Sequence, residues 1–194
     1  ARGLTRRGFL HAGTALAVAG ATTACSRGDD VKPRPEGVPL SPYTKTTTTD
    51  EVLSGIDLAG KTVLVTGATS GLGLESMRAL AAHGARVIGT GRTLAKAQEA
   101  CASVGPNCTP LECELESLDS VRACAEAVRA LGMPLDVLML NAGIMSLPKL
   151  EQVRGLEKQF AVNHLSHFLL AHRLLERVKA APQGRVVTLS SSAY

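Results

Sequence analysis

The sequence has no tryptophan and few other aromatic residues, with three phenylalanines and two tyrosines among 194 residues. Proteins that bind nucleic acid by stacking bases usually carry more aromatic surface than this. An excess of one charge is also missing, since 21 basic residues face 17 acidic ones. The resulting net charge of +4 is dispersed along the chain, which argues against a nucleic-acid-binding protein.

No C-x-x-C pair occurs among the five cysteines. Zinc ribbons and thioredoxin-like redox sites need such pairs, so neither is expected, and no metal site is predicted. Cys113 and Cys124 lie in apolar patterns that favour buried thiols. His164 and His167 are expected to pack or to face solvent rather than to bind zinc.

Residues 1–25 have the form of an export signal. Arg6 and Arg7 precede a Gly/Ala-rich apolar stretch that ends at Ala24 and is too short to span a membrane stably. The arginine pair resembles that of a twin-arginine (Tat) signal, which implies a periplasmic or membrane-anchored protein. The alternative is a chance arginine pair on the arm of a cytoplasmic protein. Both a lipid anchor at Cys25 and plain cleavage near Ala24 remain open.

The chain changes character after residue 50. Residues 26–50 are rich in proline, threonine, glycine and charge, which predicts a disordered linker without a core. Residues 51–194 form the predicted globular domain. Because the chain begins at Ala1 and ends at Tyr194, directly after an apolar run, we interpret it as a fragment whose domain is incomplete at its C-terminus.

Short β-branched runs alternate with helical patterns from residue 61 onward. Such alternation requires crossover connections between parallel strands. The fold class predicted is therefore α/β, a doubly wound parallel sheet of the Rossmann type, with ligands beyond the carboxyl ends of the strands. Strands are expected at residues 62–66, 85–90, 109–115, 136–140 and 185–190, and helices after Gly73 through 80–83, at 94–103, 118–131 and about 156–179.

A glycine-rich turn connects the first predicted strand to the first long helix. Its sequence is Thr-Gly-x-x-x-Gly-x-Gly, with glycines at positions 67, 71 and 73. Glycines let the backbone approach a pyrophosphate closely, and the helix N-terminus offers free N–H groups to its charge. The turn alone would be a weak signal, but a strand before it and a helix after it favour a dinucleotide site. A P-loop is disfavoured because no Gly-Lys-Ser/Thr follows.

This glycine spacing resembles that of the short-chain dehydrogenase/reductase (SDR) family. Three further landmarks occur in the family's order: Asn-Ala-Gly at residues 141–143, Asn163 and the Ser190-Ser191 pair. The segment Phe-Ala-Val-Asn-His-Leu-Ser-His-Phe at 160–168 is similar to the retinol dehydrogenase and WW-domain oxidoreductase branch. The resemblance extends from about residue 51 to the C-terminus and implies an oxidoreductase that interconverts an alcohol and a carbonyl.

The resemblance also implies which residues bind the cofactor. The phosphates would contact the turn and helix start at Gly67, Ser70, Gly71, Leu72 and Gly73. The adenosine would contact two strand ends, at Glu114 and Leu115 and at Asn141, Ala142 and Gly143, where Glu114 replaces the family's usual Asp. Arg92 corresponds to the basic residue that faces the 2′-phosphate, and no acidic residue ends the second strand, which favours NADP(H) over NAD(H).

Two catalytic residues are implied within the chain, Asn163 and Ser191, with Ser190 as the near alternative to Ser191. The family's Tyr-x-x-x-Lys should follow a dozen or more residues after the serine, and Tyr194 lies too close to serve. The main alternative is therefore a truncated, non-catalytic dinucleotide-binding remnant. A small alcohol or carbonyl compound is the expected substrate. Residues 168–175 could form a homodimer face, although packing on the sheet is the favoured role.

Overall fold

The computed structural model describes residues 41–44 and 46–190. The predicted export signal, with Arg6, Arg7 and Cys25, lies outside the described residues, as do Ser191 and Tyr194. Residues 43–190 contain one parallel sheet and the helices that cover it.

The sheet has five parallel strands in the order β3-β2-β1-β4-β7, so the prediction of a doubly wound α/β fold is confirmed. The chain builds outward from β1 in one direction and then returns to build in the other. This reversal places a crevice between β1 and β4 at the carboxyl edge of the sheet. The strands are β1 (Thr62–Val65), β2 (Arg86–Gly91), β3 (Cys108–Glu112), β4 (Val137–Leu140) and β7 (Arg185–Thr188).

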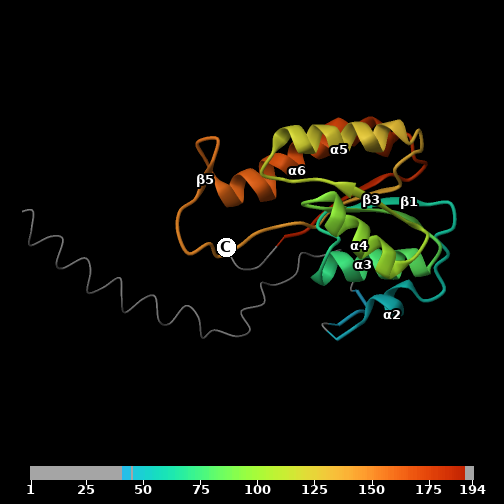
Figure 1. Ribbon diagram of the computed structural model, residues 1–194. Coiled ribbons are helices and arrows are strands. Elements are labelled where there is room, and N and C mark those ends of the chain that lie inside the picture. The colour runs from blue at the N-terminus through green and yellow to red at the C-terminus, as the bar shows by residue number, and fades with distance from the viewer. Residues whose placement is uncertain (1–40, 45, 191–194) are drawn as a thin grey trace, which may run out of the picture. The chain divides into compact units, whose positions relative to one another are not determined.

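Helices cover both faces of the sheet, as Figure 1 shows. Helices α3 (Gly71–Ala82) and α4 (Leu94–Val104) lie on one face, and α5 (Leu118–Ala130) and α6 (His167–Lys179) lie on the other. The side chains of Thr93 and Ser117 cap the N-termini of α4 and α5 by accepting hydrogen bonds from the backbone. These caps fix where both helices begin, after the loops that follow the carboxyl ends of β2 and β3.

Strand β1 is buried on both faces, as expected of the central strand of a parallel sheet. Side chains alternate along it, so Leu64 packs in the core beneath α5 and α6, while Val63 and Val65 pack in the core on the α3 and α4 side. Met77 is the large buried side chain that α3 contributes to that second core. The strand therefore joins two cores and holds the glycine turn at its end rigidly in place.

One predicted helix begins later than expected. Residues 156–179 were expected to be helical throughout, but Leu156–Glu157 is strand β6, paired with β5 (Gln152–Val153) in a short antiparallel hairpin. The Glu157 carboxylate accepts the N–H groups of Gln159 and Phe160, so it caps the helix that follows. After the helical residues Lys158 and Gln159, the chain forms the π-helix η1 (Phe160–Ser166), which continues directly into α6.

The predicted boundary between linker and domain falls inside a helix. Helix α2 (Thr49–Leu53) begins at a capping box formed by Thr48 and Glu51. The Thr49 hydroxyl donates to Glu75 of α3 over 2.5 Å, and Arg78 pairs with Asp50 over 2.9 Å. The end of the expected linker is therefore folded against α3.

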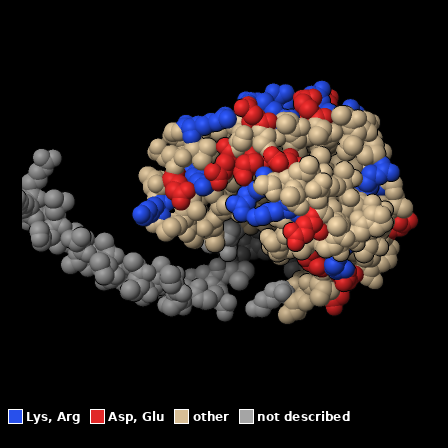
Figure 2. Space-filling view, viewed as in Figure 1, with Lys and Arg blue, Asp and Glu red and all other residues tan. Residues whose placement is uncertain are grey.

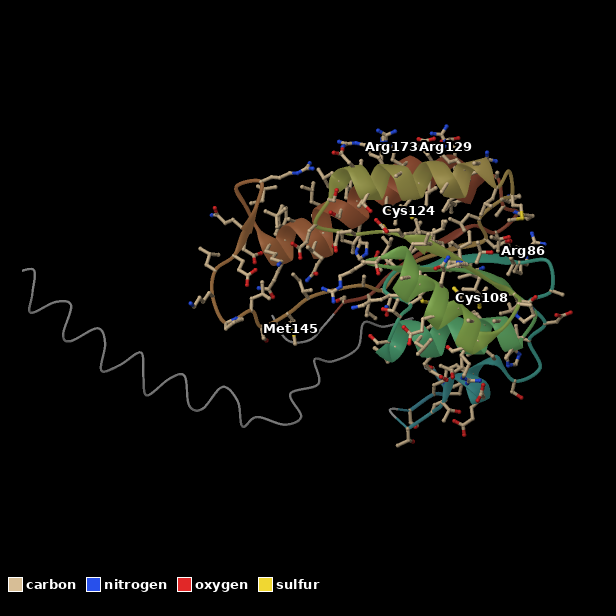
Figure 3. The ribbon with its side chains drawn as sticks, viewed as in Figure 1. Arg86, Cys108, Cys124, Arg129, Met145 and Arg173 are labelled. Carbon is tan, nitrogen blue, oxygen red and sulfur yellow. The ribbon has the colours of Figure 1, made fainter. Side chains whose placement is uncertain are left out.

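Basic and acidic side chains are interspersed on the face shown in Figure 2. Figure 3 shows Arg129 and Arg173 on the outer surface of α5 and α6, where both approach Glu126, at 3.1 and 3.6 Å. No helix among residues 41–44 and 46–190 is long and apolar enough to cross a membrane.

Candidate functional site

A cavity of about 460 Å³ opens at the carboxyl edge of the sheet, where the strand order reverses. It receives the loops that follow β1, β2, β3 and β4, the positions at which doubly wound sheets bind ligands. All the predicted cofactor-binding residues line it except Gly71, which opens α3 beside it: Gly67, Ser70, Leu72, Gly73, Arg92, Glu114, Leu115, Asn141, Ala142 and Gly143.

The glycine turn is shaped by close backbone contacts at Gly67 and Gly73. Gly67 has a φ of 67°, and a Cβ there would lie 2.9 Å from the Cβ of Ala142. A Cβ at Gly73 would overlap the Gly67 carbonyl oxygen and lie 2.6 Å from the Asn141 side-chain nitrogen. The helix therefore starts directly against the turn, which leaves the cavity wall made of backbone.

The N-terminus of α3 differs from those of α4 and α5 because its N-cap residue, Ser70, makes no capping hydrogen bond. The first N–H groups of a helix have no partner within the helix, and they attract anions together with the helix dipole. Since Ser70, Leu72 and Gly73 line the cavity, this helix end can bind a phosphate there.

A second cavity of about 420 Å³ shares Thr69, Ser70 and Arg92 with the first. Lys96, in the first turn of α4, also lines it. Both cationic side chains are exposed, and neither forms an ion pair with a carboxylate of the described residues. Thr90 and Gly91 end β2, so no carboxylate stands at the end of that strand, and Glu99 of α4 is the acidic residue that lines the second cavity.

The loop after β3 lines the cavity with Glu114 and Leu115, the two residues that the resemblance assigns to adenosine binding. The Glu114 carboxylate turns back on its own loop and accepts the N–H of Glu116 over 3.1 Å. The Ser120 hydroxyl accepts the backbone N–H of Glu114 over 2.9 Å. Leu115 is held by its carbonyl oxygen, to which the buried Ser166 hydroxyl donates over 2.5 Å. These bonds fix the loop independently of any ligand.

Asn163 lies in η1, and its side chain is clamped on the backbone of Ile144. Its Oδ1 accepts the Ile144 N–H over 2.9 Å, and its Nδ2 donates to the Ile144 carbonyl over 2.7 Å. Asn163 therefore braces the loop that borders the cavity. Ser190, the alternative catalytic serine, follows β7 in an exposed position at the same edge of the sheet, directly before the undescribed Ser191.

Comparison with known proteins identifies the family. The sequence profile of the short chain dehydrogenase family matches residues 61–194. The chain belongs to the short-chain dehydrogenase family. Members of this family are oxidoreductases that bind nicotinamide dinucleotides, so the fold and the glycine turn now have a common explanation.

Two relatives support the branch indicated by residues 160–168. Human WW domain-containing oxidoreductase is 40% identical over 157 residues, covering 78% of this chain and 38% of the relative. Mouse retinol dehydrogenase 12 is 39% identical over 146 residues, covering 73% of this chain and 46% of the relative. The chain thus spans half or less of the length of these two relatives.

Two solved structures share the fold. A metagenomic short-chain oxidoreductase in complex with NADP has a TM-score of 0.61 and 30% identity, over 70% of this chain and 64% of that one. The 3-ketoacyl-(acyl-carrier-protein) reductase of Brucella melitensis, complexed with NADH, has a TM-score of 0.55 and 28% identity, over 63% and 52%. Both dinucleotides therefore occur among structural relatives of this short-chain dehydrogenase.

Sequence reasoning missed three residues of this site. Lys96 could have been found because it follows Arg92 by four residues on a predicted helix start. Thr66 and His167 could not, because their hydrogen bond joins residues 101 positions apart. Of the two alternatives expected for His167, packing inside the protein and facing solvent, the first is confirmed, because His167 is buried. No group of three or more His, Cys, Asp or Glu side chains in the described part of the chain could hold a metal ion.

Proposed function

We propose that this short-chain dehydrogenase binds NADP(H) and interconverts a small alcohol and the corresponding carbonyl compound. The observation that carries the cofactor choice is the pair of unpaired cations, Arg92 and Lys96, on a cavity that adjoins the glycine turn. A guanidinium can bind a phosphate through two parallel hydrogen bonds, and an ammonium adds a point charge beside it.

The residues present fit such a cofactor. The uncapped start of α3 and the backbone wall at Gly67 and Gly73 suit a pyrophosphate. The second cavity suits a further phosphate, because Thr69 and Ser70 offer hydroxyl groups beside Arg92 and Lys96. When bound, the dinucleotide supplies or accepts the hydride. The chain's own residues bind it, orient it and brace the neighbouring loop.

The cofactor preference is tested by titrating the protein with NADPH and NADH. Arg92→Ala should weaken NADPH binding by about 1.5–3 kcal/mol, the scale of hydrogen bonds to a charged group, and should spare NADH. Lys96→Ala should weaken NADPH binding by less, because it removes one point charge. Equal losses for both dinucleotides would contradict a 2′-phosphate at this position.

Arg86→Ala is the matched control for these variants. Arg86, labelled in Figure 3, occupies the start of β2, whereas Arg92 follows the other end of that strand. It contacts Met133 and does not line either cavity. Its removal should leave both dinucleotide affinities unchanged. Absence of binding by either dinucleotide to the unmodified protein would contradict the proposed function itself.

The interconversion of alcohol and carbonyl is proposed for a protein that also includes a proton-transferring tyrosine and lysine. Residues 1–194 contain Asn163 and the Ser190-Ser191 pair but no Tyr-x-x-x-Lys after these serines. The alternative of a non-catalytic remnant is not favoured by the relatives, which are named as an oxidoreductase and a dehydrogenase. The activity is tested by measuring aldehyde- or ketone-dependent oxidation of NADPH by a protein that carries the tyrosine and lysine of Tyr-x-x-x-Lys.

Two further expectations are also proposals. Helix α6 packs Leu170 and Leu174 into the core, while Phe168 and Leu175 are exposed on its other side. That second side would form the homodimer face, so Phe168→Glu should convert a dimer to a monomer in sedimentation experiments.

A lipid anchor at Cys25 would be detected by the mass of the N-terminal peptide, and Cys25→Ala should remove it.

A further inference from the structure

The Thr66 hydroxyl organises the turn that follows β4. Thr66 is 1% exposed and lies directly after β1. Its Oγ1 accepts the backbone N–H groups of Asn141 over 2.9 Å and of Ala142 over 3.0 Å. A hydroxyl has two acceptor lone pairs and one proton, so these two bonds leave only the proton available.

That proton is directed to His167, and this fixes the state of the imidazole. The His167 Nε2 lies 3.0 Å from the Thr66 oxygen, whereas the Met139 carbonyl, the other acceptor near Thr66, lies at 3.5 Å. Nε2 must therefore accept, which places the ring proton on Nδ1. Burial lowers the pKa of His167 below its ordinary value, which also favours the neutral ring.

The other end of the imidazole gives the same answer independently. Nδ1 lies 3.0 Å from the Asn163 carbonyl oxygen, which can only accept. The backbone N–H of His167, which would serve that carbonyl in a regular α-helix, donates instead to the His164 carbonyl. The imidazole N–H thus binds the Asn163 carbonyl where the π-helix meets α6.

These bonds close a ring across four segments of the fold. Asn163 is clamped on Ile144, which follows the turn at Asn141 and Ala142. The turn is held by Thr66, Thr66 is bound to His167, and His167 returns to Asn163. The ring joins the cavity wall to the helix that carries Asn163, so that neither moves alone.

We propose that His167 is a positioning residue that fixes Asn163 relative to the dinucleotide-facing turn at residues 141–143, acting as the Nδ1–H tautomer. This role rests on the proposed function of the cavity as a dinucleotide site. The proposal makes a direct spectroscopic prediction for the unmodified protein. Two-dimensional ¹H–¹⁵N spectra of the histidine rings at neutral pH should show His167 with protonated Nδ1 and unprotonated Nε2. The Nε2–H tautomer, or a charged ring, would overturn the proposal.

Two substitutions separate the two ends of the imidazole. His167→Asn keeps a δ-amide donor for the Asn163 carbonyl and loses the bond to Thr66. His167→Gln keeps an ε-amide group for the Thr66 hydroxyl and loses the bond to Asn163. In His167→Asn, amide hydrogen exchange should accelerate about threefold to tenfold at Asn141 and Ala142, the scale of one lost hydrogen bond, and stay unchanged at Ile144.

In His167→Gln, the pattern should reverse, with faster exchange at Ile144 and unchanged exchange at Asn141 and Ala142. Equal acceleration at all three positions in both variants would indicate a merely structural histidine and overturn the proposal. NADPH titration of the same variants keeps the two proposals distinguishable. The reciprocal exchange pattern without dinucleotide binding would contradict the proposed function, while binding without that pattern would contradict the role of His167.

Discussion

Gly73 lies so close to the carbonyl group of Gly67 that no side chain fits between them. A Cβ at Gly73 would meet the Gly67 backbone, which cannot move away cheaply, and the Asn141 side-chain nitrogen, which donates to the Thr66 carbonyl over 2.9 Å and would lose that bond by moving. Gly73→Ala should therefore lower the free energy of unfolding by about 3 kcal/mol, the upper part of the range for overpacked sites. It should also abolish dinucleotide binding, because the helix start must shift away from the turn.

Gly143→Ala is the matched control for this substitution. Gly143 lines the same cavity, but its nearest neighbour for an added Cβ is the Asn163 Oδ1 at 3.6 Å, an ordinary contact distance. The melting temperature of the Gly143→Ala variant should stay close to that of the unmodified protein. If thermal unfolding shows equal destabilisation in both variants, the close approach at Gly73 is not the cause.

Glu75 makes the attachment of α2 to α3 sensitive to acid. Hydrogen bonds from Arg78 and Thr49 hold the pKa of Glu75 at about 2, below the ordinary value of 4.5. A lowered folded-state pKa stabilises the protein above the unfolded-state value, and this stabilisation is lost as pH falls from about 4.5 toward 2. Glu75→Gln should thus melt earlier than the unmodified protein at neutral pH, with the difference shrinking across this window.

The measurement is the melting temperature of both proteins between pH 7 and pH 2. Glu176→Gln serves as the control, because among residues 41–44 and 46–190 Glu176 forms an ion pair only with Lys179 on its own helix, over 3.0 Å. Such exposed ion pairs contribute little to the stability of the fold, so this variant should have the same melting temperature as the unmodified protein at neutral pH. A Glu75→Gln difference that persists unchanged at pH 2 would contradict the assigned cause.

The sheet was predictable from the sequence because its signals are local. The apolar run at residues 62–66 and the glycines after it identify a buried strand and a helix start without knowledge of distant residues. The missed helix α2 was also local, since Thr48 and Glu51 have the spacing of a capping box. Its signal was obscured because the threonine-rich segment around it is typical of a linker.

The late start of η1 and the ring around His167 depend on contacts that no local pattern contains. The helical periodicity extends back to Leu156, and only the Glu157 cap and the β5–β6 pairing show that the helix begins after Glu157. From the sequence, Thr66 is predicted only to be the last residue of an apolar strand. Its partners Asn141 and His167 lie 75 and 101 residues away along the chain. Local sequence patterns therefore do not predict the hydrogen bonds that Thr66 forms with them.

Cys113 and Cys124 should be chemically inert in the folded protein. Both are buried, and a hydrogen bond with Cys124, together with burial, raises the pKa of the Cys113 thiol. Burial, with the nearby Cys101, raises the pKa of the half-buried Cys108 to about 11, which leaves about one thousandth of it as thiolate at pH 8. A Cys25→Ser variant should therefore react slowly with a disulfide reagent until it is unfolded, when all four thiols should react.

Mass spectrometry of the labelled peptides identifies which cysteine reacts first. Cys108 is the expected first site, because it is the only cysteine in the described part of the chain that is not fully buried. A Cys108→Ser variant should remove that early reaction and leave the slow phase unchanged. Rapid labelling of Cys113 in the native protein would contradict the burial of this thiol.

We propose that Arg6 and Arg7 direct export through the twin-arginine route, which moves folded proteins and would let the dinucleotide domain bind its cofactor first. Residues 1–40, fused to a reporter, should carry it across the membrane of a bacterium that has this route. Arg6→Lys with Arg7→Lys keeps both charges and the apolar stretch after them, so a signal that needs only charge would still work. Reporter activity in the periplasmic fraction should fall to background in the double variant. Export that continues unchanged, or that never occurs with the native pair, would refute this proposal and favour the cytoplasmic alternative.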